Sequence, residues 1–107
     1  MRFKQDTIVF GAVQEGEKIG TEFIFENTGK DPLEIEIVSA CECIYMDWTE
    51  GPIPAKALGR INLIFNTAGH SGNQSKTIDV IFKNTDANDY PLVKQVQLLV
   101  QVLPKRE

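Results

Sequence analysis

The sequence predicts an all-β fold, a sandwich of about seven antiparallel strands. Apolar and polar residues alternate at every second position in several short runs, which is the period of half-buried strands. Clusters of Gly, Pro, Asn and Asp separate these runs at near-regular spacing, and no long run has the period of a helix. The chain of 107 residues has the length of one immunoglobulin-like sandwich, so we expect a single domain over residues 1–107.

The first half of the chain contains three predicted strands. Residues 7–10 read as an opening edge strand, because Gly11 follows where a strand bends or bulges. Residues 19–26 alternate cleanly between apolar and polar positions. A turn at residues 27–32 follows, and we expect it to bring the strand that begins at Leu33 beside the preceding strand as an antiparallel neighbour.

The third of these strands leads to the two cysteines. The apolar side chains of residues 33–37 share one face, and if the alternation persists Cys41 and Cys43 point inward as well. Val38 falls on the opposite face, which indicates a bulge or a change of sheet near this position.

The second half supplies the remaining strands. Residues 44–48 form a short strand that runs into a loop rich in proline, and residues 59–66 read as a central strand. Residues 77–82 and 93–102 alternate apolar and polar side chains in the same way. All of these segments fit the two layers of a sandwich.

Composition excludes several classes of partner. The formal net charge is −4 and the sequence has no Lys/Arg cluster apart from Lys105 and Arg106, so we expect no nucleic-acid partner. No apolar run is long enough to span a membrane. The N-terminus lacks the apolar core of a signal peptide, which leaves a cytoplasmic protein or a mature exported domain. We expect a monomer or a weak dimer.

A set of residues spread over the whole chain carries a family resemblance: Phe10, Gly11, Val13, Gly16, Glu17, Phe23, Phe25, Asn27, Thr28, Gly29, Pro32, Leu33, Ile35, Cys41, Cys43, Pro52, Ile53, Pro54, Gly59, Ile61, Phe65, Asn66 and Thr67. This pattern resembles the bacterial domain-of-unknown-function family 1573. The resemblance implies an immunoglobulin-like sandwich akin to the ASH and major sperm protein domains. It also implies a periplasmic or cell-envelope setting, since such domains usually occur in exported proteins or lipoproteins of Bacteroidetes-type bacteria. It implies no established activity.

The two cysteines are candidates for chemistry. Thiolates at Cys41 and Cys43 could share a soft cation such as Cu(I) or Zn(II), with Met46 or His70 as a third ligand. A redox-active thiol is a further alternative. The favoured interpretation is that both are small buried residues at the end of a strand, as free cysteine usually is. A disulfide between them would close a very small ring and would be strained in extended geometry. We expect no cofactor.

The other candidates are a histidine and an aromatic cluster. His70 stands beside Ser71 in a glycine-rich loop, but nothing else in the sequence indicates a catalytic triad, and we expect no enzymatic activity. Tyr45, Trp48 and Ile53 form an apolar cluster at a strand-to-loop transition that is typical of a recognition surface. The alternative, which we prefer, is that Trp48 closes the end of the core over the cysteines.

The sequence therefore predicts a non-enzymatic module that binds a protein or peptide, or has a structural role, in an exported or cell-envelope protein. Exposed sheet edges or the Trp48 loop would form the binding surface. The alternative function is a soft-metal (Cu or Zn) or redox thiol site at Cys41 and Cys43.

Overall fold

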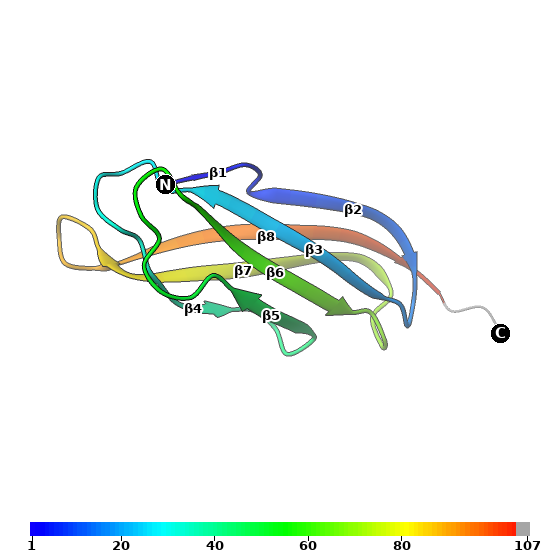
Figure 1. The fold of residues 1–107 in the computed structure, drawn as a ribbon. Helices are drawn as coiled ribbons and strands as arrows, with labels where there is room; N and C mark the ends of the chain where they lie inside the picture. The colour runs from blue at the N-terminus through cyan, green and yellow to red at the C-terminus, as the bar shows by residue number, and fades with distance from the viewer. Residues whose placement is uncertain (105–107) are drawn as a thin grey trace.

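The computed structural model describes residues 1–104, and it is a sandwich of two four-stranded sheets (Figure 1). The strand order is β1-β3-β6-β5 in one sheet and β2-β8-β7-β4 in the other. Lys105 and Arg106 lie outside the described residues. The strands are β1 (Arg2–Phe3), β2 (Thr7–Gln14), β3 (Lys18–Glu26), β4 (Ile35–Ser39), β5 (Ile44–Trp48), β6 (Leu58–Asn66), β7 (Gly72–Thr85) and β8 (Pro91–Leu103).

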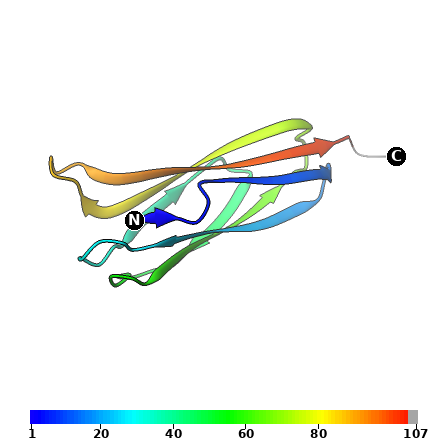
Figure 2. The same ribbon diagram turned by 90° about the horizontal axis from the view of Figure 1, so that it is seen from above.

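The predicted all-β sandwich is confirmed, with eight strands of which β1 has two residues. The molecule is elongated, with extents of 54 × 23 × 19 Å, and its two layers run along the long axis (Figure 2). One strand pair departs from the antiparallel expectation: β2 runs parallel to β8. These strands come from opposite ends of the chain, so no hairpin imposes an antiparallel orientation on them.

The expected pairing of the second and third predicted strands is wrong. β3 pairs with β1 and β6, whereas β4 pairs with β7 in the opposite sheet. Residues 27–34, here called the first crossover, therefore carry the chain from one sheet to the other. Residues 40–43, the second crossover, return it from β4 to β5.

The buried side chain of Asn27 explains why the first crossover is not a hairpin. Its amide Nδ2 donates hydrogen bonds to the carbonyls of Asp31 (2.8 Å) and Ile53 (3.0 Å). Its Oδ1 accepts a hydrogen bond from the N–H of Gly29. These bonds curl the turn around Asn27 and fasten it to the segment that follows β5, so Leu33 pairs with Ile53 and not with β3.

The bulge expected near Val38 lies one step earlier in the chain. The register of β4 against β7 shifts between Ile35 and Ile37. Consequently Val38 is 2% exposed and Ile37 is 48% exposed, the reverse of the predicted faces. β4 ends at Ser39 and the chain turns before β5, so the alternation does not continue to the cysteines. Cys41 is exposed and Cys43 is half-buried, so the prediction of two inward-pointing cysteines is wrong.

The alternation predicted for the longer strands is confirmed in the core between the sheets. β6 is paired on both sides, by β3 and β5, as a central strand should be. Within residues 1–104 no helix has the length and hydropathy that crossing a membrane requires. The buried apolar side chains are those of Ile19, Phe23, Phe25, Leu33, Ile35, Val38, Ile44, Ile53, Ile61, Leu63, Phe65, Ile78, Val80, Phe82, Val96, Leu98, Val100 and Val102.

Candidate functional site

Strand β5 forms one edge of its sheet and presents two different faces. Ile44 is buried, and Met46 and Trp48 are partly buried against the core. Tyr45 points to the opposite side and is 68% exposed. A short edge strand with one apolar face and one aromatic side chain in solvent is thus available at the side of the sandwich.

The backbone bonds at the two ends of β5 define which of its groups are free. The N–H of Asn66 donates to the carbonyl of Cys43, and the N–H of Thr49 donates to the carbonyl of Arg60, each at 3.0 Å. In an antiparallel ladder the residues whose N–H and C=O face the partner alternate with residues whose groups face away. Between Cys43 and Thr49, the groups of Met46 and Trp48 therefore face the open edge.

Three exposed side chains lie beside this edge, and we call them the Tyr45 surface: Tyr45, Asp47 and Ile64. Tyr45 is directly opposite Ile64 on β6, and Ile64 is 43% exposed. On the other side of Ile64 stands Gly20 of β3, which has no side chain to cover it. Asp47 accepts a hydrogen bond from Asn62 Nδ2 at 2.9 Å through Oδ1. The surface thus combines an apolar pair with one carboxylate.

The other edges of the two sheets are less regular. β1 has only two residues. β2 has a register shift between Val9 and Gly11, where Gly11 has a φ of 97°, and β4 has the shift between Ile35 and Ile37. Bulges of this kind turn an edge away from further pairing. β5 pairs with β6 over its whole length without a shift and is a regular open edge.

The two cysteines lie in the second crossover, immediately before β5, and form a disulfide. The N–H of Ile44 donates to the carbonyl of Cys41 at 3.1 Å, which closes a tight turn around the pair. The interpretation of Cys41 and Cys43 as buried free thiols is therefore wrong. A disulfide is compatible with this position because the chain turns here and is not extended.

The proposed additional metal ligands, Met46 and His70, pack against other side chains. Met46 points into the sandwich and packs against the core. The ring centroids of His70 and Phe65 are 5.5 Å apart. Lys76 Nζ lies 5.3 Å from the same Phe65 centroid. Within residues 1–104 no group of three or more His, Cys, Asp or Glu side chains is arranged to hold a metal ion.

Two of the predicted interaction residues, Trp48 and Ile53, are partly or fully buried. Trp48 is half-buried at the far end of β5, about 13 Å along the strand from Ile44, so it does not close the core over the cysteines. Ile53 is 2% exposed, and its backbone exchanges hydrogen bonds with Leu33. Of the predicted cluster, Tyr45 is the residue that a partner can reach.

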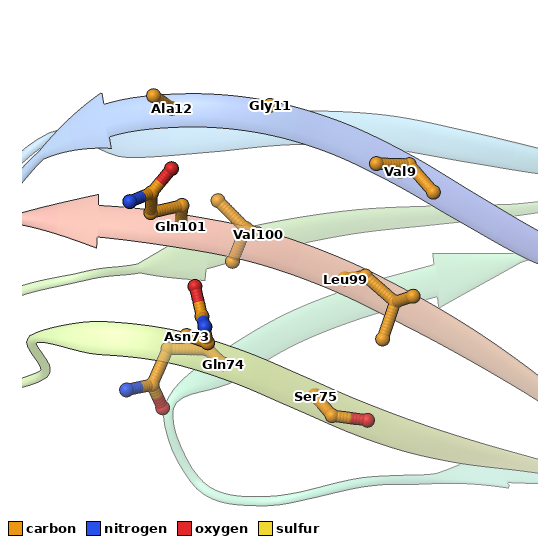
Figure 3. Close-up of a pocket in the computed structure, with 9 residues that line it drawn as sticks. All are labelled: Val9, Gly11, Ala12, Asn73, Gln74, Ser75, Leu99, Val100 and Gln101. Carbon is orange, nitrogen blue, oxygen red and sulfur yellow. The ribbon is translucent and has the colours of Figure 1, made fainter.

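A shallow hollow lies on the outer face of the opposite sheet, where β2, β8 and β7 meet (Figure 3). Its volume is about 360 Å³. Val9 and Leu99 form an apolar part, and no charged side chain or histidine takes part. The full lining is Val9, Gly11, Ala12, Asn73, Gln74, Ser75, Leu99, Val100 and Gln101. The hollow offers no acid–base pair for catalysis.

Comparison with known proteins identifies the family. The model of a family described as a protein of unknown function, DUF1573, matches residues 1–96. The chain belongs to the DUF1573 family. No curated protein matches the chain.

Solved structures share the fold of this DUF1573 domain. The ASH/PapD-like domain 7 of human CEP192 is 14% identical, with a TM-score of 0.72 over 98% of this chain and 86% of that one. The Vibrio cholerae VesB protease is 12% identical, with a TM-score of 0.73 over 92% of this chain and 31% of the protease. The secreted serine protease VesC from Vibrio cholerae is also 12% identical (TM-score 0.57) over 88% of this chain and 21% of VesC. At these identities the similarity is one of fold.

Sequence reasoning missed two members of the Tyr45 surface, Asp47 and Ile64. Ile64 stood out as an apolar residue between Asn62 and Asn66 on the polar face of its strand. That pattern was visible in the sequence of this DUF1573 domain. The position of Ile64 opposite Tyr45 was not, because it depends on the register between β5 and β6.

Proposed function

We propose that this DUF1573 domain is a non-enzymatic interaction module that receives an extended segment of a partner protein along β5. The observation that carries the proposal is the regular open edge at Met46 and Trp48, whose backbone groups face away from β6. An added strand would pair with these groups, which is a common mode of peptide recognition. The exposed ring of Tyr45 beside the edge supports the same site, since tyrosine is enriched at binding hot spots.

The Tyr45 surface indicates the chemistry of the partner segment. A residue opposite Tyr45 on an added strand would lie on the outer face, where an aromatic or β-branched side chain packs best. Two residues along, the side chain opposite Asp47 would meet a carboxylate that accepts a hydrogen bond from Asn62. The partner is therefore an extended segment with an apolar residue and a basic residue two positions apart. The net charge of −4 on the domain also favours a positively charged partner segment.

A peptide-display selection against the purified chain tests this proposal. Selected peptides should carry the apolar and basic pair and shift the amide resonances of Met46 and Trp48. Tyr45→Lys should weaken their binding by about tenfold or more, because it removes the aromatic contact and adds a positive charge. Val9→Lys is the matched control, since Val9 is 74% exposed on β2, the bulged edge of the other sheet. Equal loss in both variants, or peptides without the pattern, would contradict the β5 site.

The cellular setting belongs to the same proposal. We place the domain in an exported or cell-envelope protein, because disulfides such as Cys41–Cys43 persist in oxidising compartments. Labelling of thiols in intact cells, before and after lysis, measures whether the pair is oxidised at its natural location. Full labelling without prior reduction would contradict an oxidising compartment.

A Cu or Zn site at Cys41 and Cys43 is the second candidate function. It applies to the reduced chain, because a soft metal needs both sulfurs as thiolates. The Cα atoms are 5.3 Å apart, which is close enough for both sulfurs to reach one ion. Elemental analysis of protein reduced and purified without oxygen tests this candidate, with Cys41→Ser as the control.

A further inference from the structure

Backbone hydrogen bonds hold the two cysteines in place independently of their sulfur atoms. The Ile44 N–H donates to the Cys41 carbonyl, and the Asn66 N–H donates to the Cys43 carbonyl. The first bond closes the turn and the second anchors it to the end of β6. Breaking the S–S bond removes neither of them. The two sulfurs would therefore stay within reach of each other in the reduced chain.

The disulfide also contributes little as a cross-link. A disulfide stabilises a fold mainly by restricting the unfolded chain, and this effect grows with the length of the loop it closes. Cys41 and Cys43 are two positions apart in the sequence, so the loop is near the minimum length. The buried core comes from strands on both sides of this turn and does not include either cysteine. Stabilisation of the fold is thus a poor explanation for the Cys41–Cys43 disulfide.

The two sulfur-bearing residues differ in their access to solvent. Cys41 is exposed, whereas Cys43 is half-buried and packs against the core. A thiolate approaching from solvent meets Cys41 first. These are the two cysteines of the chain, so a reduced molecule has a single intramolecular disulfide to re-form.

From this geometry we propose that Cys41–Cys43 is an exchangeable disulfide that oxidises a dithiol of a partner molecule. The partner's first thiolate attacks Sγ of Cys41 and forms a mixed disulfide. The Sγ–Sγ bond breaks, and its electron pair leaves on Sγ of Cys43, which takes a proton from water. The partner's second thiolate then attacks the partner's first sulfur, which is bonded to Sγ of Cys41. This step releases Cys41 as a thiolate. Two electrons pass to the domain, and the partner becomes a disulfide.

The first test uses dithiothreitol as the dithiol and the full 107-residue chain. The folded protein is treated with dithiothreitol, and the reaction is quenched by alkylation of the free thiols. Mass spectrometry then measures the fraction of reduced chains. The same protein in denaturant is treated in parallel. We expect folded and unfolded chains to be reduced at rates within about tenfold of each other, because the pair is accessible. The sheet signal in circular dichroism should persist in the reduced chain, and a small-molecule disulfide should restore the oxidised monomer. Reduction that requires denaturant, that unfolds the sandwich or that reverses only to intermolecular dimers would overturn the proposal.

The second test separates the two sulfurs. Cys43→Ser leaves the exposed Cys41 as the single thiol, and Cys41→Ser leaves the half-buried Cys43. We expect the Cys41 thiol to react with an aromatic disulfide reagent about tenfold faster than the Cys43 thiol, because reactivity follows exposure. Equal rates, or a faster Cys43, would overturn the assignment of Cys41 as the attacked sulfur. Circular dichroism of both variants verifies that each is folded.

Discussion

The two crossovers perform the same topological task with opposite chemistry. The first crossover, between β3 and β4, is centred on Asn27, which is 1% exposed and bonds through its side chain and through both of its backbone groups. The second crossover, between β4 and β5, is closed by a surface disulfide and one turn hydrogen bond. A buried amide holds the first connection inside the fold, whereas the second lies at its surface. The difference indicates that the first crossover serves stability and that the second is free to serve chemistry.

Asn27→Ala should give the largest effect, because it attacks the buried crossover directly. It removes the donors to the carbonyls of Asp31 and Ile53 and the acceptor for the Gly29 N–H. Leaving such groups unpaired should lower the free energy of unfolding by roughly 3 kcal/mol. Urea denaturation followed by circular dichroism measures this change. A loss as small as that of an ordinary surface substitution would show that Asn27 does not hold the crossover.

Gly59→Ala should destabilise the packing beneath the same crossover. A Cβ at Gly59 would overlap the ring of Phe25 and lie 2.9 Å from Cδ1 of Ile53. Phe25 is fully buried between Phe3 and Phe82 and has no room to move. Overpacking should lower the free energy of unfolding by roughly 2 kcal/mol. Gly20→Ala is the control in thermal denaturation, since its Cβ would meet only an ordinary contact with the Leu63 carbonyl; equal effects would contradict the close-packing argument.

Replacing both cysteines by serine should have a smaller effect. The loop closed by the disulfide spans three residues, for which the chain-entropy estimate is about 1.6 kcal/mol, roughly half that of a 15-residue loop. We therefore expect the double variant to lose no more than about 1.6 kcal/mol in urea denaturation. A loss equal to that of Asn27→Ala would erase the distinction between the two crossovers.

The smallest effect concerns an exposed ion pair at the end of the first crossover. Lys83 Nζ lies 2.7 Å from Glu34 Oε2, and the hydrogen bond and charge of Glu34 raise the pKa of Lys83 above 10.5. A raised pKa in the folded state means that the contribution is complete below the unfolded pKa and disappears as pH rises through the folded value. Stability measured against pH should thus fall above about pH 10.5, and Lys83→Met should reduce that fall. An identical pH profile in the variant would contradict this linkage.

The sequence predicted more of the fold than of the candidate site. The alternation in β6 and β8 correctly predicted which side chains form the core. Tyr45 was one of three candidate contact residues, and of these it is the exposed one. The open backbone groups of Met46 and Trp48 were not predictable, because they depend on which strand lies beside β5 and in what register. The disulfide was disfavoured because residues 41–43 were expected to continue an extended strand, whereas the chain turns there between β4 and β5.

By itself the sequence determined that this chain is a two-layer β-sandwich, because the faces of a strand follow from a period of two residues that is local in the chain. The tertiary structure alone decided how the strands are connected. The same turn residues at 27–32 suit a hairpin or a crossover, and the buried bonds of Asn27 to the distant Ile53 select the crossover. The parallel pairing of β2 with β8 and the open edge of β5 have the same origin. Each depends on contacts between segments far apart in the sequence, which local patterns do not encode.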